Sequence, residues 1–116
     1  RQQGRLPAKA CADLQHVLLN LLLNAVQACS RGGHVGLSAE GGDPVRIRIT
    51  DDGCGIRGED LERVFDPFFT TKAPDQGSGL GLMICHRIIA DHGGRIEVES
   101  LEGRGATFRV RLPIAE

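Results

Sequence analysis

The order of the predicted helices and strands is the feature that most limits which fold this chain can adopt. Two stretches with helical apolar spacing are each followed by a pair of short runs in which apolar and polar residues alternate. The helices are predicted from about Lys9 or Asp13 to Ser30 and from about Leu80 to Asp91. The strands are predicted at 34–40, 45–51, 95–100 and 106–112. Consecutive strands joined by short links pair antiparallel, so this order argues against a doubly wound parallel sheet.

The expected fold is α+β, a two-layer α/β sandwich with a mixed, mostly antiparallel sheet and helices on one face. The 116 residues suffice for one domain, and we assign 1–8 to a linker remnant and 9–116 to that domain. A short helix is expected near Glu59–Val64, and residues 65–79 are expected to form a long irregular loop. With four Phe and no Trp or Tyr, the core is expected to be aliphatic.

Composition removes several classes of function. A net charge of −1 gives no footprint for nucleic acid and no polybasic surface for a membrane. No apolar run reaches membrane-spanning length, and no signal peptide is recognisable. The four cysteines are widely spaced, which favours reduced thiols in a cytoplasmic protein over a disulfide or metal framework. The chain begins at Arg1 rather than Met, so we expect it to be a piece of a longer protein.

The first helix carries two asparagines, Asn20 and Asn24, inside a run of leucine, valine and alanine. On a helical wheel a polar stripe falls within about 40° of Asn20. Its members are Asp13, His16, Asn20, Asn24, Gln27 and Arg31. A solvent face explains such a stripe, but it would more often carry Glu and Lys than the weaker helix former Asn. A face that meets a polar ligand or a hydrated cation has use for amide oxygens. The stripe alone leaves both interpretations open.

Two glycine motifs suggest a phosphate or nucleotide ligand. Asp51-x-Gly53-x-Gly55 follows a predicted strand, where glycines let the backbone approach a ligand and a carboxylate can accept from an amino group. Gly77-Ser78-Gly79-Leu80-Gly81-Leu82 opens the second helix, where bare N–H groups attract anions. Each motif alone is equally explained by a tight turn or a hinge.

Between these motifs lies the segment 65–72, which holds three of the four phenylalanines and Lys72. One interpretation is that the phenylalanines pin a loop to the core. The other is that they anchor a movable lid whose cation, Lys72, lies near phosphates.

Taken together and in this order, the motifs resemble those of the ATP-binding catalytic domain of bacterial sensor histidine kinases, in particular the nitrogen-regulator-like branch. That fold is shared with gyrase-, Hsp90- and MutL-type ATPases. The segments that resemble the family's N box, first glycine box, F box, second glycine box and last motif are 15–25, 51–56, 65–72, 77–82 and 103–108. The resemblance spans about residues 9–113, nearly the whole chain.

The resemblance implies Mg–ATP as the bound cofactor and assigns roles by position. Asn24 would be the Mg²⁺ ligand, Asn20 and Gln27 would lie beside the phosphates, and Lys72 would be the nearby cation. Asp51 would accept from the adenine amino group, with Thr107 close to the base. The adenine pocket would be shaped by Gly53, Gly55 and Ile56. Backbone N–H groups for the phosphates would come from Gly77, Ser78, Gly79, Leu80, Gly81 and Leu82.

Departures from the family pattern define the alternatives. His16 stands where family members usually have Gln, so its titration could tune affinity, although a neutral surface role is the simpler interpretation. ATPase branches carry a water-activating Glu at the position of Asn20, and Asn cannot act as a general base. Transfer to histidine is therefore favoured over hydrolysis. The alternatives are a GHKL-type ATPase or nucleotide-dependent clamp, and a docking module with a vestigial site.

The partner that receives the phosphoryl group is expected outside this chain. None of the four histidines, His16, His34, His86 and His92, stands in a sequence like the family's phosphoacceptor helix, and His92-Gly93-Gly94 resembles a structural turn. The resemblance implies an acceptor on a helical dimerisation domain of the same parent and a downstream response regulator. We expect no nucleic-acid or direct membrane contact, and a monomer for the isolated domain.

Overall fold

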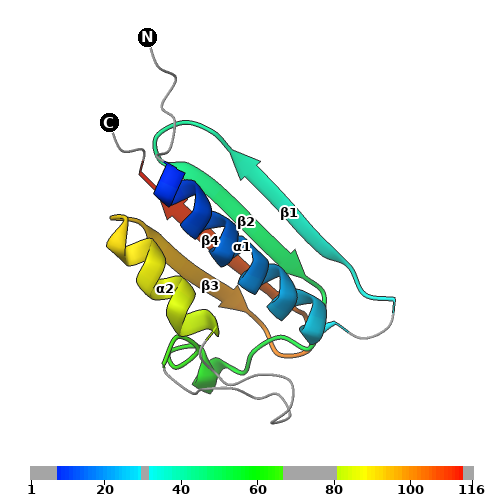
Figure 1. Ribbon diagram of the computed structural model, residues 1–116. Coiled ribbons are helices and arrows are strands. Elements are labelled where there is room, and N and C mark those ends of the chain that lie inside the picture. Colours follow the sequence, from blue (N-terminus) through cyan, green and yellow to red (C-terminus); the bar gives the residue numbers. More distant parts are fainter. Residues whose placement is uncertain (1–7, 30–31, 67–80, 114–116) are drawn as a thin grey trace.

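The computed structural model describes residues 8–29, 32–66 and 81–113. Two helices lie side by side across one face of a four-stranded sheet (Figure 1). The elements are α1 (Ala8–Ala28), β1 (Val35–Glu40), β2 (Val45–Asp51), α2 (Gly81–Asp91), β3 (Arg95–Ser100) and β4 (Ala106–Leu112). The strand order is β1-β2-β4-β3, and each neighbouring pair is antiparallel. The expected two-layer α+β sandwich is confirmed, while no parallel pair occurs among the described strands.

The predicted helices and strands agree with the structure to within one or two residues at most ends, and one short predicted element differs in type. The three strands β2, β3 and β4 match the expected residues, and β1 begins one residue later than predicted. The helix expected near Glu59–Val64 is instead a 3₁₀ turn over Gly58–Asp60 that continues as tight turns. Successive i→i−3 hydrogen bonds hold this segment, for example from the Arg63 N–H to the Asp60 carbonyl at 2.9 Å. A segment this short does not offset the cost of nucleating an α-helix.

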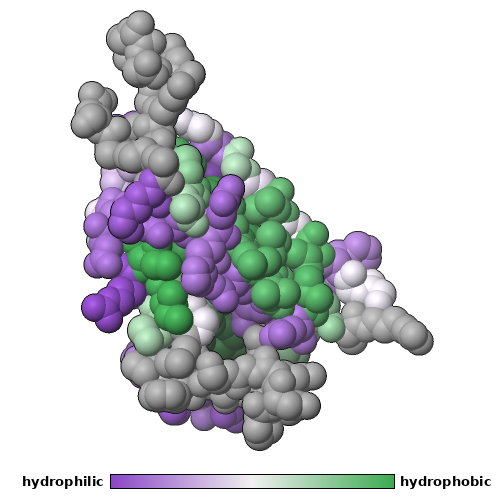
Figure 2. Space-filling view, in the orientation of Figure 1, coloured by the Kyte–Doolittle hydropathy of each residue, from purple (hydrophilic) through white to green (hydrophobic). Residues whose placement is uncertain are grey.

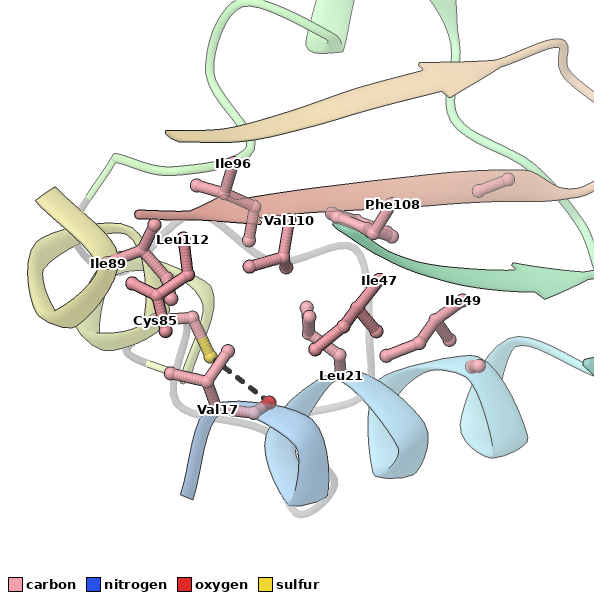
Figure 3. Close-up of a cluster of buried hydrophobic side chains, with 12 residues drawn as sticks. Val17, Leu21, Ile47, Ile49, Cys85, Ile89, Ile96, Phe108, Val110 and Leu112 are labelled. Atoms are coloured by element: carbon pink, nitrogen blue, oxygen red, sulfur yellow. Dashed lines mark hydrogen bonds between the residues drawn. The ribbon is translucent and has the colours of Figure 1, made fainter. Parts of the chain in front are cut away.

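The core lies between the helices and the inner face of the sheet (Figure 3). It is aliphatic apart from Phe108, as expected from the composition. From α1 it takes Val17 and Leu21, both 0% exposed, and from α2 it takes Cys85 and Ile89. Val17 lies on the side of α1 against which α2 packs, and this contact buries it. Burial also raises the pKa of the Cys85 thiol to about 11, which keeps it protonated.

The two helices are also tied at the end of α2. Gly94 donates to the Ile89 carbonyl and Gly93 to the Ala90 carbonyl, the paired bonds of a Schellman cap. His92 Nε2 lies 2.8 Å from Asp13 Oδ2, and Lys9 Nζ lies 2.9 Å from the same oxygen. These hydrogen bonds, that of His92 above all, lower the pKa of the Asp13 carboxyl. The expectation that His92-Gly93-Gly94 forms a structural turn is confirmed.

One part of the helical face is apolar and exposed (Figure 2). Its residues come from the side of α1 turned away from α2 and from the edge strand β1: Leu19, Leu23, Val26, Val35 and Leu37. β1 is exposed along its whole length. Among the described residues, no helix has the length and apolar character needed to cross a bilayer.

Candidate functional site

The polar stripe of α1 leads from the start of α2 to the loop that follows β2. Asn20 is half-buried, and its Nδ2 donates to the His16 carbonyl at 3.1 Å. A Cβ built on Gly81, the first residue of α2, would lie 3.5 Å from Asn20 Oδ1. Two turns further along α1, the Ala28 carbonyl accepts from the Cys54 N–H at 3.1 Å. Asn24, half-buried, lies between these points, which are separated by roughly 12 Å along the helix axis.

Asp51 is the buried carboxylate of this region, at 5% exposure. Its Oδ1 accepts from the Gly53 N–H at 2.8 Å. Burial raises the pKa of Asp51, and hydrogen bonds from the Gly53 and Ala106 N–H groups act in the opposite direction. Two carboxylate oxygens offer about four acceptor positions, so these bonds leave capacity for a ligand amino group.

Glycines around Asp51 are required because other backbone comes too close for a side chain. A Cβ on Gly53 would overlap the Ala28 carbonyl and lie 3.0 Å from Asp51 Oδ1. Gly105, at φ +89°, would place a Cβ against the carbonyl of Asp51 itself. The backbones of the end of α1, the loop after β2 and the β3–β4 turn therefore contact one another around the Asp51 carboxylate. Gly55 and Ile56, the other residues of the first glycine motif, are half-buried in the same loop.

Two residues of this region were not anticipated. Ser100 Oγ accepts from the Ile56 N–H at 2.7 Å and donates to the Gly105 carbonyl at 2.6 Å, which locks the glycine loop to the β3–β4 turn. The sequence feature that could have identified Ser100 is its position on β3, where it shares the inward face with Ile96 and Val98. Ala106 was missed because its contribution is a backbone N–H, which side-chain chemistry does not reveal.

Thr107 follows Ala106 on β4, next to the position that pairs with Asp51. Its partner in the sheet is Thr50, and the two hydroxyl oxygens are 3.3 Å apart. Neighbouring residues on a strand point to opposite faces, so Thr107 is on the outer face of the sheet whereas Ala106, opposite Asp51, is on the inner face. The place near the base, directly or through water, that the resemblance implies for Thr107 stays a prediction.

Two predicted segments are only partly described. Phe65 packs edge-on against Phe108, with ring centroids 6.3 Å apart, and stacks obliquely on His86 at 5.0 Å. Phe65 therefore holds the first residue of the segment 65–72 against the core. Gly81 begins α2 and Leu82 packs against the core. Lys72, Gly77, Ser78, Gly79 and Leu80 lie outside the described residues.

The residues present fit a nucleotide with a divalent cation. A buried carboxylate with spare acceptor capacity suits a ligand amino group, and the glycines allow other backbone to lie close to that carboxylate. Amide oxygens on α1 are hard ligands of the kind Mg²⁺ prefers. The described residues contain no cluster of three or more His, Cys, Asp or Glu placed to hold a metal ion.

Comparison with known proteins agrees with the motifs. Residues 11–116 match the family described as histidine kinase-, DNA gyrase B- and HSP90-like ATPase. The chain is 51% identical over 102 residues to the sensor histidine kinase ZraS of Escherichia coli O157:H7, an alignment that covers 87% of this chain and 22% of ZraS. It thus spans about a fifth of the length of such curated relatives.

Solved structures agree as well. The nucleotide-free catalytic domain of histidine kinase ThkA superposes with a TM-score of 0.77 at 39% identity, over 89% of this chain and 67% of that one. Full-length ShkA in complex with AMPPNP gives a TM-score of 0.78 at 36% identity, over 89% of this chain and 22% of that one.

Proposed function

The chain belongs to the histidine kinase-, DNA gyrase B- and HSP90-like ATPase family, and on that premise we propose that it is the ATP-binding catalytic domain of a two-component sensor histidine kinase. Membership of this family implies ATP binding. The proposal adds Mg²⁺, a direction for the nucleotide along α1, and transfer of the γ-phosphoryl group to a histidine on another domain of the parent protein. The similarity to ZraS, ThkA and ShkA supports this assignment.

The observation that carries the proposal is the placement of Asp51 and Asn20 at opposite ends of one polar stripe. Asp51 and the glycine loop, packed on the last turn of α1, are suited to adenine. Asn20 Oδ1 faces Gly81 at the start of α2, where helix N–H groups favour phosphates. The nucleotide then runs along α1 from Ala28 toward Asn20. Gln27, on the same stripe, and the segment 72–80 are proposed to complete the phosphate site.

Asn24 lies between the two ends and is proposed as the Mg²⁺ ligand. Bound Mg²⁺ would neutralise phosphate charge and orient the transferred group. A side-chain oxygen on a helix that is itself packed against the core is held in place without a loop rearrangement. With no arginine in the 73–76 segment, Lys72 is proposed as the additional cation.

Asn20 favours transfer to a histidine over hydrolysis. Water must lose a proton to attack well, and an amide cannot accept it, whereas a neutral imidazole already offers a lone pair. Asn20 Nδ2 is engaged with the His16 carbonyl, so its oxygen is the atom turned toward Gly81. The proposal therefore predicts that the chain alone hydrolyses little ATP. Steady hydrolysis that is lost in Asn24→Ala would favour an ATPase or clamp instead.

We expect Asn24→Ala to weaken Mg–ATP binding by roughly tenfold or more, the value of one lost charge-assisted contact. The stimulation of binding by Mg²⁺ should disappear in the same variant. Calorimetric titrations with ATP in Mg²⁺ and in EDTA measure both effects. Gln15→Ala is the matched control, because Gln15 is exposed on the same helix outside the polar stripe. If Asn24→Ala retains the full Mg²⁺ stimulation, the proposed ligand is wrong.

The wider setting follows from the same proposal. The acceptor is a helical dimerisation domain of the parent, the next partner is a response regulator, and the domain itself works in the cytoplasm. A phosphotransfer assay with the full-length parent and radiolabelled ATP tests the first of these. Label on a histidine outside this chain is expected.

A further inference from the structure

The outer face of the sheet, which neither helix covers, gathers five arginines on its two central strands and one edge strand. We call this the arginine face; its members are Arg46, Arg48, Arg95, Arg109 and Arg111. All project from the face opposite the core, because they alternate with buried residues along β2, β3 and β4. Three glutamates, Glu40, Glu97 and Glu99, share this side of the sheet, so the positive charge is concentrated where arginines adjoin one another.

The register places like charges directly beside one another. Arg46 is opposite Arg111, and Arg111 is opposite Arg95, which makes a row of three arginines across three adjacent strands. At about 4.8 Å between strands the row spans roughly 10 Å. Two residues further along the strands, toward their middle, Arg48 is opposite Arg109. Like charges at directly opposite positions destabilise a sheet, so this pattern is not explained by sheet stability.

Two of the five arginines form ion pairs, both with glutamates of the edge strand β3. Arg109 Nη2 lies 2.7 Å from Glu99 Oε1, and Arg95 Nη1 lies 4.0 Å from Glu97 Oε2. Within the described part of the chain, Arg46, Arg48 and Arg111 form no ion pair. Glu40 of β1 stands opposite Arg46 on the other side. The face thus has a cationic centre between two acidic rims.

A recess adjoins the row of three. It has a volume of about 280 Å³ and is lined by Arg95 and Arg111 together with Gly93, Gly94 and Asp43. Gly94 rests on the Arg111 carbonyl, which holds this wall in place. Two of the lining residues are arginines, whose planar guanidinium forks suit bidentate contact with carboxylates, while Asp43 adds one negative charge to the rim.

We propose that the arginine face is a docking surface for an acidic segment of a partner protein, whose central carboxylates are flanked by basic residues. Such a segment matches the cationic centre and the acidic rims together. A continuous polyanion such as nucleic acid would run its phosphates over Glu40, Glu97 or Glu99, and no aromatic side chain projects from this face to stack on bases. A lipid surface would lack apolar anchors here, because the other outward residues are small or polar: Gly36, Ser38, Thr50 and Thr107.

The surface is independent of the nucleotide site. Asp51 ends β2 on the inner face, whereas Arg46 lies near its start on the outer face, about 17 Å away along the strand. Loss of docking and loss of ATP binding are therefore separable outcomes.

The test is fluorescence anisotropy with a labelled peptide that carries six central glutamates between flanking lysines. A peptide of the same composition with alternating Lys and Glu is the comparison. We expect the blocked peptide to bind saturably at low salt, more tightly than the alternating one, and to dissociate as salt is raised. The double variant Arg46→Gln, Arg111→Gln should lower its affinity about tenfold or more, because two charge-assisted contacts are lost.

Two controls make the result decisive. Arg87→Gln, at an exposed arginine of α2, should leave peptide binding unchanged. The double variant should melt at the same or a higher temperature and bind ATP as the unsubstituted chain does, because it removes a like-charge pair far from Asp51. Equal binding of both peptides, an equal loss in Arg87→Gln, or tighter binding of anionic vesicles or a DNA duplex to the same arginines would overturn the proposal.

Discussion

Gly105→Ala is expected to destabilise the domain by about 3 kcal/mol, the sum of a left-handed backbone conformation and a steric overlap. At φ +89° an alanine is strained, and its Cβ would collide with the carbonyl of Asp51, which belongs to the strand that carries the proposed adenine contact. A loss of this size is a large part of the 5–15 kcal/mol typical of a domain. The shift of the urea midpoint measures it.

The same turn supplies the control. Gly103 has φ +82°, but nothing lies within 4 Å of the Cβ that alanine would add. Gly103→Ala should therefore cost only the backbone term, about 1 kcal/mol. Equal losses in the two variants would contradict the close approach between Gly105 and Asp51 on which this site is built.

Asp51→Asn should weaken ATP binding by about 10- to 100-fold, because hydrogen bonds to charged groups are worth about 1.5–3 kcal/mol. The amide can still accept from the Gly53 N–H through its oxygen, but its NH₂ group faces donors where the carboxylate offered acceptors. The loss should be specific to the base. GTP, which presents a carbonyl oxygen in place of the adenine amino group, should bind the unsubstituted chain weakly and lose little in the variant.

Asp52→Asn is the neighbouring control for the same calorimetric titrations. The Asp52 carboxylate is exposed and accepts from the His34 N–H at 2.8 Å, on the β1 side of the loop. Its removal should leave ATP affinity unchanged. If Asp52→Asn costs as much as Asp51→Asn, the effect is one of loop stability or net charge, and Asp51 has no special role in binding the base.

The strands were predictable from sequence because each carries its own signal. In 45–51 and 106–112 residues that face the core alternate with polar residues that face outward. A glycine or proline lies within two residues of each end of both strands. The 59–64 segment lacks such a signal. Its polarity suits a helix or a string of turns equally, and the buried Asp60, bonded to Arg57 at 3.3 Å, is a tertiary feature that periodicity does not contain.

The motifs indicated which segments belong to the candidate site, but not which way the side chains of α1 and β4 face. Asp51 and Gly53 are joined by a hydrogen bond at one end of α1, and Asn20 lies near Gly81 toward the other end. A helical wheel shows which residues of α1 share a face, but not that the flank with Val17 is the one that α2 buries. Thr107 was placed by position in a motif, whereas the parity of β4 decides which face its side chain takes.

The central claim is that α1, the glycine loop after β2 and the start of α2 form one Mg–ATP site. The most direct measurement is a calorimetric titration of the unsubstituted chain with ATP, once in Mg²⁺ and once in EDTA. The account predicts saturable binding with one nucleotide per chain that is clearly tighter in Mg²⁺. Absence of binding at millimolar ATP, or binding of ATP and GTP with equal affinity, would contradict it.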